Sequence, residues 1–215
     1  MAGKKSLPLL GQPSKSAGGE EFYQHIADDL LHLDVGAVRF SAHDRTLWAT
    51  DASAYQVQPI GVVMPNSPDQ ARRALAYCAQ HRLPVLPRGG GTSLAGQCTN
   101  HAVVIDFSVG CRRLLAVDPL GQSCTVEPGL TIEELNANLA GRGLRRFFAP
   151  DPATIAQAAI GGCIGNNAAG ARSIRYGRTS ENVAGVEVLL SSGDRVWLQT
   201  GAGRTDGVAL RLAQK

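Results

Sequence analysis

Three consecutive glycines at residues 89–91 constrain this chain more than any other feature of its sequence. A short apolar run that predicts a strand precedes them, and two hydroxyl side chains, Thr92 and Ser93, follow them. Glycine tolerates positive φ angles and has no Cβ, so successive backbone N–H groups can turn toward one point that a ligand approaches closely. Such a concave row of N–H groups binds anionic oxygens. The stretch therefore predicts a phosphate-binding loop, with Arg88 adding a positive charge at its entry.

Two common phosphate loops are excluded by what the stretch lacks. A Walker loop needs a lysine followed by Ser or Thr after its last glycine, and no lysine lies near. A Rossmann loop needs a third spaced glycine where Leu94 stands, and then a crossover helix. Only residues 94–101 separate the loop from the next apolar run, whereas a parallel crossover takes about a dozen residues or more. We therefore interpret Asp106 as the end of a strand rather than a ribose-binding acid. An ordinary glycine-rich turn is the alternative to the phosphate loop.

A second stretch of small residues lies further along the chain. It contains Pro150–Thr154, Ile160–Gly162, Asn166–Arg172 and Tyr176–Gly177. Small residues let the backbone pack close to a planar ring, and amide side chains can both donate hydrogen bonds to it and accept them from it. Taken alone, the stretch fits equally well a turn with asparagines in left-handed conformations.

Together the two stretches resemble the PCMH-type (vanillyl-alcohol-oxidase type) FAD-binding domain, and more narrowly its D-lactate, glycolate and D-2-hydroxyglutarate dehydrogenase branch. The resemblance covers residues 55–195, with both stretches in the family's order. It implies an α+β fold of two α/β subdomains that binds FAD, with the pyrophosphate on the glycine loop and the flavin ring near the second stretch. The FAD-binding residues that it implies are Arg88, Gly89, Gly90, Gly91, Thr92, Ser93, Gly96, Asp151, Gly161, Gly162, Asn167 and Gly170.

The same resemblance sets expectations for the chemistry. The family's substrate-side residues, including metal-binding histidines, lie in a later domain, so we assign no catalytic residue and no metal to this chain. The substrate implied is a small 2-hydroxy acid that binds through that domain. FAD is expected to be non-covalent, because Cys98 and Cys163 are not placed like the family's attachment residues. Ala159 stands where the family usually has Thr or Ser, so we expect one hydroxyl contact to the cofactor to be absent, with backbone N–H groups there able to serve instead. The alternatives are a non-catalytic or remnant flavin-binding module and a phosphate-binding domain without flavin.

We expect the chain to divide near residue 55. Residues 1–54 form a disordered tail (1–19) and a helical extension (20–33), followed by a polar linker. Residues 55–215 form the FAD-binding domain, with the pyrophosphate-loop subdomain at about 55–140 and a second subdomain at about 141–215. The second subdomain is expected to be incomplete at its carboxyl end, because residues 201–215 are polar or helix-like and contain no closing strand.

Several local signals predict individual elements. Ser67-Pro68-Asp69 is a favourable helix start: a capping hydroxyl, a proline in the first turn and an acid at the positive end of the helix dipole. A capping box at residues 131–134 opens another helix. Hairpins are predicted around the turns at residues 118–121 and 191–194.

Composition excludes several classes of function. A net charge of +3 is too small to indicate a nucleic-acid-binding protein, and the 5% of aromatic residues are not interleaved with basic ones as in base-stacking surfaces. The five cysteines lack C-x-x-C spacing, and an odd number without a secretory signal indicates reduced thiols. No apolar run reaches membrane-spanning length, so we expect a cytoplasmic protein.

Overall fold

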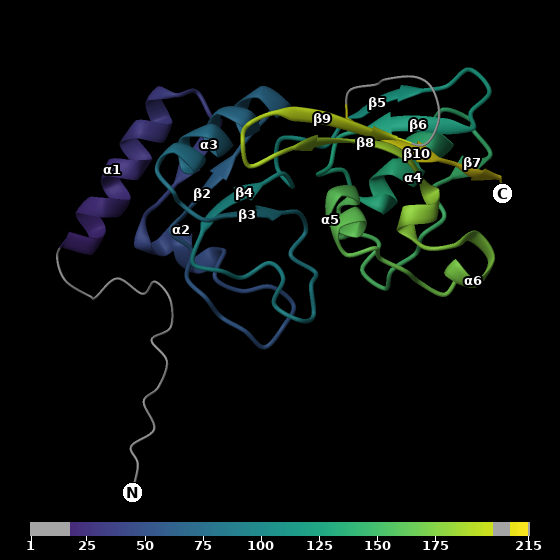
Figure 1. Cartoon of the computed structure of the whole chain (residues 1–215). Coiled ribbons are helices and arrows are strands. Elements are labelled where there is room, and N and C mark those ends of the chain that lie inside the picture. Colours follow the sequence, from purple (N-terminus) through teal and green to yellow (C-terminus); the bar gives the residue numbers. More distant parts are fainter. Residues whose placement is uncertain (1–17, 200–206, 215) are drawn as a thin grey trace, which may run out of the picture.

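Two separate sheets organise the chain, each with its own hydrophobic core (Figure 1). The computed structural model describes residues 18–199 and 207–214. We call residues 18–106 the first lobe and residues 114–199 with 207–214 the second lobe. The predicted disordered tail lies outside the described residues, except for Gly18 and Gly19, which already belong to the first helix. The mixture of helices and two sheets confirms the α+β class.

The first sheet has the strand order β1-β2-β4-β3. The inner strands β2 and β4 and the edge strand β3 run parallel to one another, and β1 pairs with β2 antiparallel. β2 and β4 are buried along their whole length, as expected of parallel strands covered on both faces. The strands are β1 (Ala37–Arg39), β2 (Gly61–Met64), β3 (Val85–Arg88) and β4 (Val103–Asp106).

Three helices pack around this sheet: α1 (Gly18–His32), α2 (Ala42–Leu47) and α3 (Pro68–Gln80). α3 begins as the sequence predicts, because the Ser67 hydroxyl accepts a hydrogen bond from the backbone N–H of Gln70. The predicted helix at residues 20–33 is also present, as α1. It is no loose extension, however, since Ile26 and Leu30 are buried in the same core as α3. The expected linker, residues 39–55, follows β1 and contains α2.

The second sheet is antiparallel throughout, with the strand order β5-β6-β10-β8-β9. Both predicted hairpins are present, and Thr131 and Glu134 form the predicted capping box of α4. The strands are β5 (Leu114–Val117), β6 (Ser123–Val126), β8 (Val183–Leu189), β9 (Arg195–Gln199) and β10 (Val208–Arg211), with a small separate pair of β7 (Arg146–Phe147) and β11 (Ala213–Gln214). The helices are α4 (Ile132–Gly141), α5 (Ile160–Gly165), the short α6 (Ser173–Tyr176) and the 3-10 turn η1 (Thr179–Asn182).

Two expectations about this lobe are wrong. The chain passes from one sheet to the other between Asp106 and Leu114, not near residue 140, because the β5–β6 hairpin pairs with β10 of the second sheet. The chain also contains a strand where none was expected. β10 lies in the middle of the second sheet, and its Val208 and Leu210 are buried in the second core. Both errors concern pairing between segments distant in sequence.

The second lobe sits against the carboxyl edge of the parallel strands. The connection between the lobes crosses the end of β2, where the Cys111 thiol donates a hydrogen bond to the carbonyl of Pro65 (3.4 Å). Figure 1 shows the β8–β9 hairpin extending from the second lobe toward α3. There Arg195 Nη1 lies 3.7 Å from Asp69 Oδ1 of α3. The carboxyl edge of an open parallel sheet is where such sheets bind ligands, and here two lobes meet at it.

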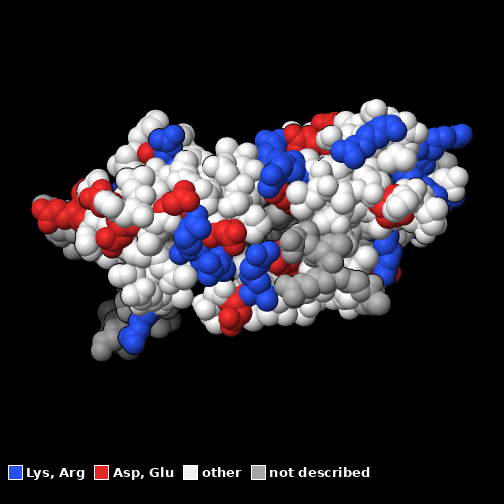
Figure 2. All heavy atoms as spheres, turned by 90° about the horizontal axis from the view of Figure 1, so that it is seen from above, with Lys and Arg blue, Asp and Glu red and all other residues white. Residues whose placement is uncertain are grey.

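Charges of both signs are spread over the surface. Figure 2 shows acidic and basic side chains interspersed along one face, without a continuous basic stripe on that face. None of the helices in residues 18–199 has the length and apolarity needed to cross a membrane. The cytoplasmic location stays a prediction.

Candidate functional site

The glycine loop leaves the carboxyl end of β3, as predicted, and returns to the sheet at β4. β3 and β4 are parallel neighbours, with Arg88 opposite Asp106. The two strands therefore pair in parallel, contrary to the expectation that the connection between them is too short for a parallel crossover. Residues 89–102 connect β3 to β4 as a loop that contains no helix. Asp106 does end its strand, as expected.

The loop presents a row of backbone donors. The N–H groups of residues 90–94 make no hydrogen bond to any residue that the structure describes, whereas Ala95 N–H donates to the Gln97 side chain. Backbone N–H groups are obligatory donors, and a row of them that is free at a strand end can bind an anion. Gly91 has a φ of +65°, a conformation that turns the row and that glycine adopts without strain.

The residues of the loop differ in their contacts with the rest of the protein. The Ser93 hydroxyl lies 3.2 Å from the Cys98 thiol, so one end of the loop contacts the other. The Thr92 hydroxyl makes no hydrogen bond to the described residues. Gly96 has a φ of +78°, and its backbone lies beneath the ring of Tyr55. Gly96 therefore affects the course of the loop, although it lies outside the row of N–H donors.

Arg88 has contacts that the sequence does not suggest. Its guanidinium donates to three backbone carbonyls, those of Trp48 (3.2 Å), Thr50 (2.8 Å) and Cys98 (3.1 Å). A direct contact of this charge with phosphate stays a prediction. In the described residues Arg88 joins the loop to residues 48–50, which were interpreted from sequence as part of a linker.

The second stretch supplies α5, whose first turn faces the loop. Ala159 is the residue before this helix and makes no side-chain cap, so the missing family hydroxyl coincides with an uncapped helix start. Gly161 packs on Pro128, where an added Cβ would lie 2.9 Å from the proline ring. Gly162 is exposed, and a Cβ there would meet no atom within 4 Å. The protein's own packing therefore does not require glycine at Gly162.

Asp151, Asn167 and Gly170 support the turn that follows α5. The Asp151 carboxylate accepts a hydrogen bond from Arg172 N–H (2.9 Å), and a Cβ on Gly170 would lie 2.0 Å from the Asp151 carbonyl. Asn167 has the left-handed conformation considered for it (φ 46°), and its Oδ1 accepts from Ser180 N–H (3.0 Å). These contacts hold the turn in place.

The two stretches meet through backbone contacts. A Cβ added to Gly90 would lie 1.9 Å from the Gln157 carbonyl oxygen, and one added to Gly89 would lie 2.7 Å from the Ala159 Cβ. Glycine at these positions therefore lets the loop of the first lobe pack directly on the second. The structure thus brings Gly89 and Gly90 of the first lobe against Gln157 and Ala159 at the seam between the lobes.

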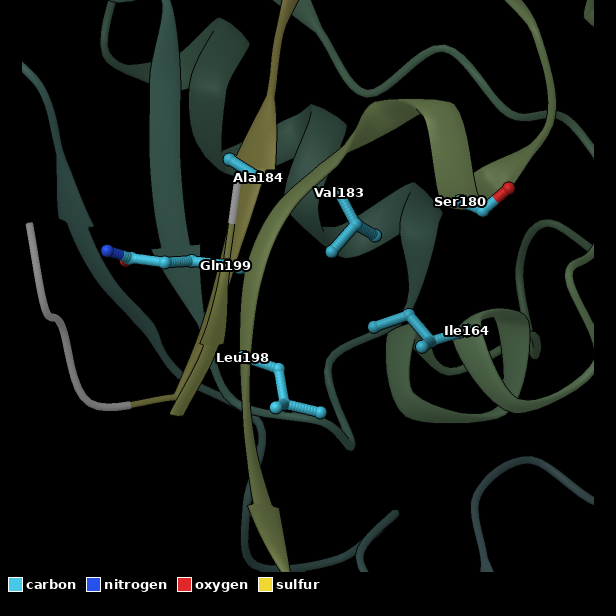
Figure 3. Close-up of a pocket in the computed structure, with 7 residues that line it drawn as sticks. Ile164, Ser180, Val183, Ala184, Leu198 and Gln199 are labelled. Carbon is cyan, nitrogen blue, oxygen red and sulfur yellow. The ribbon is translucent and has the colours of Figure 1, made fainter. Parts of the chain in front are cut away.

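A hollow of about 350 Å³ opens beside α5 (Figure 3). Figure 3 shows the side chains of Ile164, Val183 and Leu198 around a common space, with Ser180 and Gln199 at its margin. The hollow joins α5 to β8 and β9 and is lined mainly by apolar surface, as small-molecule sites commonly are. Among the described residues, no three His, Cys, Asp or Glu side chains gather as a metal site would require.

Comparison with known proteins decides the family. Residues 59–199, well over half of the chain, match the FAD binding domain family. The chain belongs to this family. The resemblance drawn from the glycine loop and the second stretch is thereby confirmed, and the cofactor of this FAD-binding domain is FAD. The unpaired donors of the loop and the open backbone at Gly162 fit such a cofactor.

Relatives of this FAD-binding domain include flavin enzymes of the expected branch. It is 34% identical over 152 residues to the glycolate oxidase subunit GlcD of Bacillus subtilis, covering 70% of this chain and 32% of the relative. It is 37% identical over 190 residues to the D-2-hydroxyglutarate dehydrogenase of Escherichia coli, covering 86% of this chain and 18% of the relative. The chain thus spans a third or less of the length of these two relatives.

Solved structures agree on the fold. p-Cresol methylhydroxylase with substrate bound superposes with a TM-score of 0.75 at 18% identity, over 93% of this chain and 44% of that one. An alkyldihydroxyacetonephosphate synthase gives a TM-score of 0.75 at 17% identity, over 95% and 42%. The FAD-binding domain therefore has the PCMH-type fold.

Proposed function

We propose that this chain is the FAD-binding domain of an FAD-linked oxidoreductase that acts on a D-2-hydroxy acid. The observation that carries the proposal is the row of unpaired N–H groups at residues 90–94, which lies at the seam with the second lobe. The named activities of the relatives support the substrate class. They include glycolate oxidase, D-2-hydroxyglutarate dehydrogenase and, in Saccharomyces cerevisiae, a mitochondrial D-lactate dehydrogenase (cytochrome) that is 32% identical over 156 residues.

The two stretches would bind different parts of the cofactor. The N–H row and the Thr92 and Ser93 hydroxyls would bind the pyrophosphate, with Gly89 and Gly96 setting the course of the loop. The flavin ring would lie near Gly161, Gly162 and the hollow beside α5. The turn that adjoins it would be held by Asp151, Asn167 and Gly170. FAD itself supplies the acceptor for a hydride. The 2-hydroxy acid would bind with the help of a further domain.

A direct test compares two glycines of α5. A Cβ meets no atom within 4 Å at either Gly162 or Gly165, so alanine at either position leaves the packing intact. At Gly162, inside the helix, alanine also favours the helix by about 1 kcal/mol. We expect Gly162→Ala to weaken FAD binding about tenfold or more, by blocking close approach of a ring, and Gly165→Ala to leave it unchanged. Titration of flavin fluorescence, with melting temperatures of both variants, makes the comparison.

An FAD affinity that is unchanged in both variants would place the cofactor away from Gly162. Equal weakening in both would show that α5 as a whole, rather than the predicted position, determines binding.

A second prediction is that FAD is bound non-covalently. Cys163 is buried, and burial raises the pKa of its thiol to about 11, so the thiolate that could attack a flavin is scarce at neutral pH. The Cys98 thiol contacts Ser93 at the base of the loop. Acid precipitation of the yellow protein should therefore leave the colour in the supernatant. Colour in the pellet would show a covalent bond.

A further inference from the structure

Residues 48–52, interpreted from sequence as part of a linker, are bound to the glycine loop. Ala52 N–H donates to the Gly91 carbonyl (3.1 Å), and Cys98 N–H donates to the Asp51 carboxylate (3.2 Å). Arg88 adds its bonds to the carbonyls of Trp48 and Thr50. The segment thus contacts the beginning, the middle and the end of the loop.

Trp48 is held at two points by the ends of two neighbouring strands. Its carbonyl accepts from Arg88, the last residue of β3, and its indole N–H donates to Asp106 Oδ2 (2.7 Å), the last residue of β4. Arg88 and Asp106 lie opposite each other in the parallel pairing. Asp106 is only 4% exposed, and its other oxygen accepts from Ser108 N–H (2.8 Å). A buried carboxylate with both oxygens bonded fixes its partners firmly.

The Arg88 guanidinium lies between the middle and the far end of the loop. A Cβ on Gly91 would be 2.6 Å from its Nη2, and its Nη1 reaches Cys98 at the far end of the loop. A carboxylate, Asp51, lies near this charge. Burial opposes the charge of Asp51, but hydrogen bonds from Ser53 and Cys98 and the nearby Arg88 outweigh it and lower the pKa of this carboxyl. Arg88 therefore acts on a carboxylate of the protein's own chain.

We infer that Arg88 and Asp106 clamp Trp48, and that this clamp gives the glycine loop its affinity for the pyrophosphate of FAD by fixing the direction of its N–H groups. Arg88 is then a positioning residue, not a phosphate ligand. The inference rests on the proposed function. Its basis is that oriented backbone donors bind an anion when they converge, while the Arg88 guanidinium is already bonded to three backbone carbonyls.

Arg88→Lys separates this role from a direct contact with phosphate. Lysine keeps the charge and binds phosphate well as a point charge, but it cannot reach three carbonyls with the planar fork of arginine. A direct contact predicts that Arg88→Lys keeps near-normal FAD affinity while Arg88→Gln loses it. The clamp predicts that both variants lose affinity by a similar factor, about tenfold or more, the effect of losing one or more charge-assisted hydrogen bonds.

Trp48→Phe tests the other half of the clamp with a milder change. It keeps an aromatic ring against Val62 and Val104, with a smaller packed area than the indole, and it removes the bond to Asp106. Tyr77→Phe is a matched control, because it removes an aromatic side chain's hydrogen bond to a carboxylate, Asp29 (2.8 Å), on the α1–α3 side of the lobe. We expect Trp48→Phe to weaken FAD binding severalfold and Tyr77→Phe to leave it unchanged.

The experiment is a fluorescence titration of FAD into each full-length variant, with circular dichroism melts and ³¹P NMR of the bound pyrophosphate. Affinity losses in Arg88→Lys, Arg88→Gln and Trp48→Phe, with altered ³¹P shifts and folded chains, would support the clamp. Retained affinity in Arg88→Lys beside a loss in Arg88→Gln would overturn it in favour of a direct contact. Normal affinity in Trp48→Phe would also overturn it. Failure of the unaltered chain to bind FAD would overturn the proposed function itself.

Discussion

Gly91→Val is expected to abolish measurable FAD binding while the chain stays folded. Gly91 lies in the middle of the N–H row with a φ of +65°, which valine adopts only under strain of about 1–3 kcal/mol. Its Cβ would also collide with the Arg88 guanidinium, which is held by three hydrogen bonds. Relief of either conflict turns the N–H groups away from their common point. Since each 1.4 kcal/mol is about a tenfold change in affinity, we expect a loss of about 100-fold or more.

Flavin fluorescence titration measures this loss, and circular dichroism reports the fold. Gly141→Val is a suitable control, because Gly141 ends α4 on the surface and a Cβ there meets no atom within 4 Å. Gly90 is not equivalent to Gly91, although the sequence treats the two alike. Valine at Gly90 would strike the Gln157 carbonyl and separate the lobes, so lost binding there has two explanations. Normal FAD affinity in Gly91→Val would show that the loop is not the pyrophosphate site.

The loop itself was predictable because its signals are local. A strand that is followed by glycines and hydroxyl residues indicates an irregular loop with free backbone N–H groups, and this signal needs no information from the rest of the chain. The same holds for the start of α3 at Ser67 and for the capping box at Thr131, where the partners are three residues apart. Family resemblance then linked the loop to the second stretch, which no local signal could do.

Other features depend on distant partners and were missed. β10 becomes a central strand only because β6 and β8 lie on either side of it, so residues 208–211 give little sign of it alone. Trp48 and Asp106 are far apart in sequence, and their contact follows from the loop topology of the first sheet. Asp51-Ala52-Ser53, with its acid and hydroxyl, was the one local hint of an ordered turn, since Ser53 N–H donates to Asp51.

The second large effect is expected in catalysis: a protein of residues 1–215 saturated with FAD should not oxidise a 2-hydroxy acid. Hydride transfer requires the substrate's α-carbon to be held over the flavin, with a base beside its hydroxyl. Correct placement of this kind can account for roughly 7–11 kcal/mol of a reaction barrier. A carboxylate clamp together with a base or metal is therefore needed within reach of the flavin.

The described residues near the second stretch offer no such set. Arg172 lies 3.6 Å from the Asp151 carboxylate and faces the Phe147 ring, and Arg175 lies over the Tyr176 ring. The histidines with assigned contacts belong to the first lobe: His25 and His32 contact aspartates of α1, His81 stacks on Tyr77, and His101 bonds the Gln58 carbonyl. None of them pairs with either arginine among the residues described.

Dye-linked dehydrogenase activity of this chain with D-lactate, glycolate and D-2-hydroxyglutarate provides the measurement. Free FAD at the same concentration sets the background, and a D-2-hydroxyglutarate dehydrogenase in the same assay shows that the conditions support turnover. We expect rates equal to the background for all three acids, because FAD held without a substrate clamp and base gains no positioning advantage. Turnover well above free FAD with any of them would place a catalytic residue within these 215 residues, and Arg172 and Arg175 would be the first to replace.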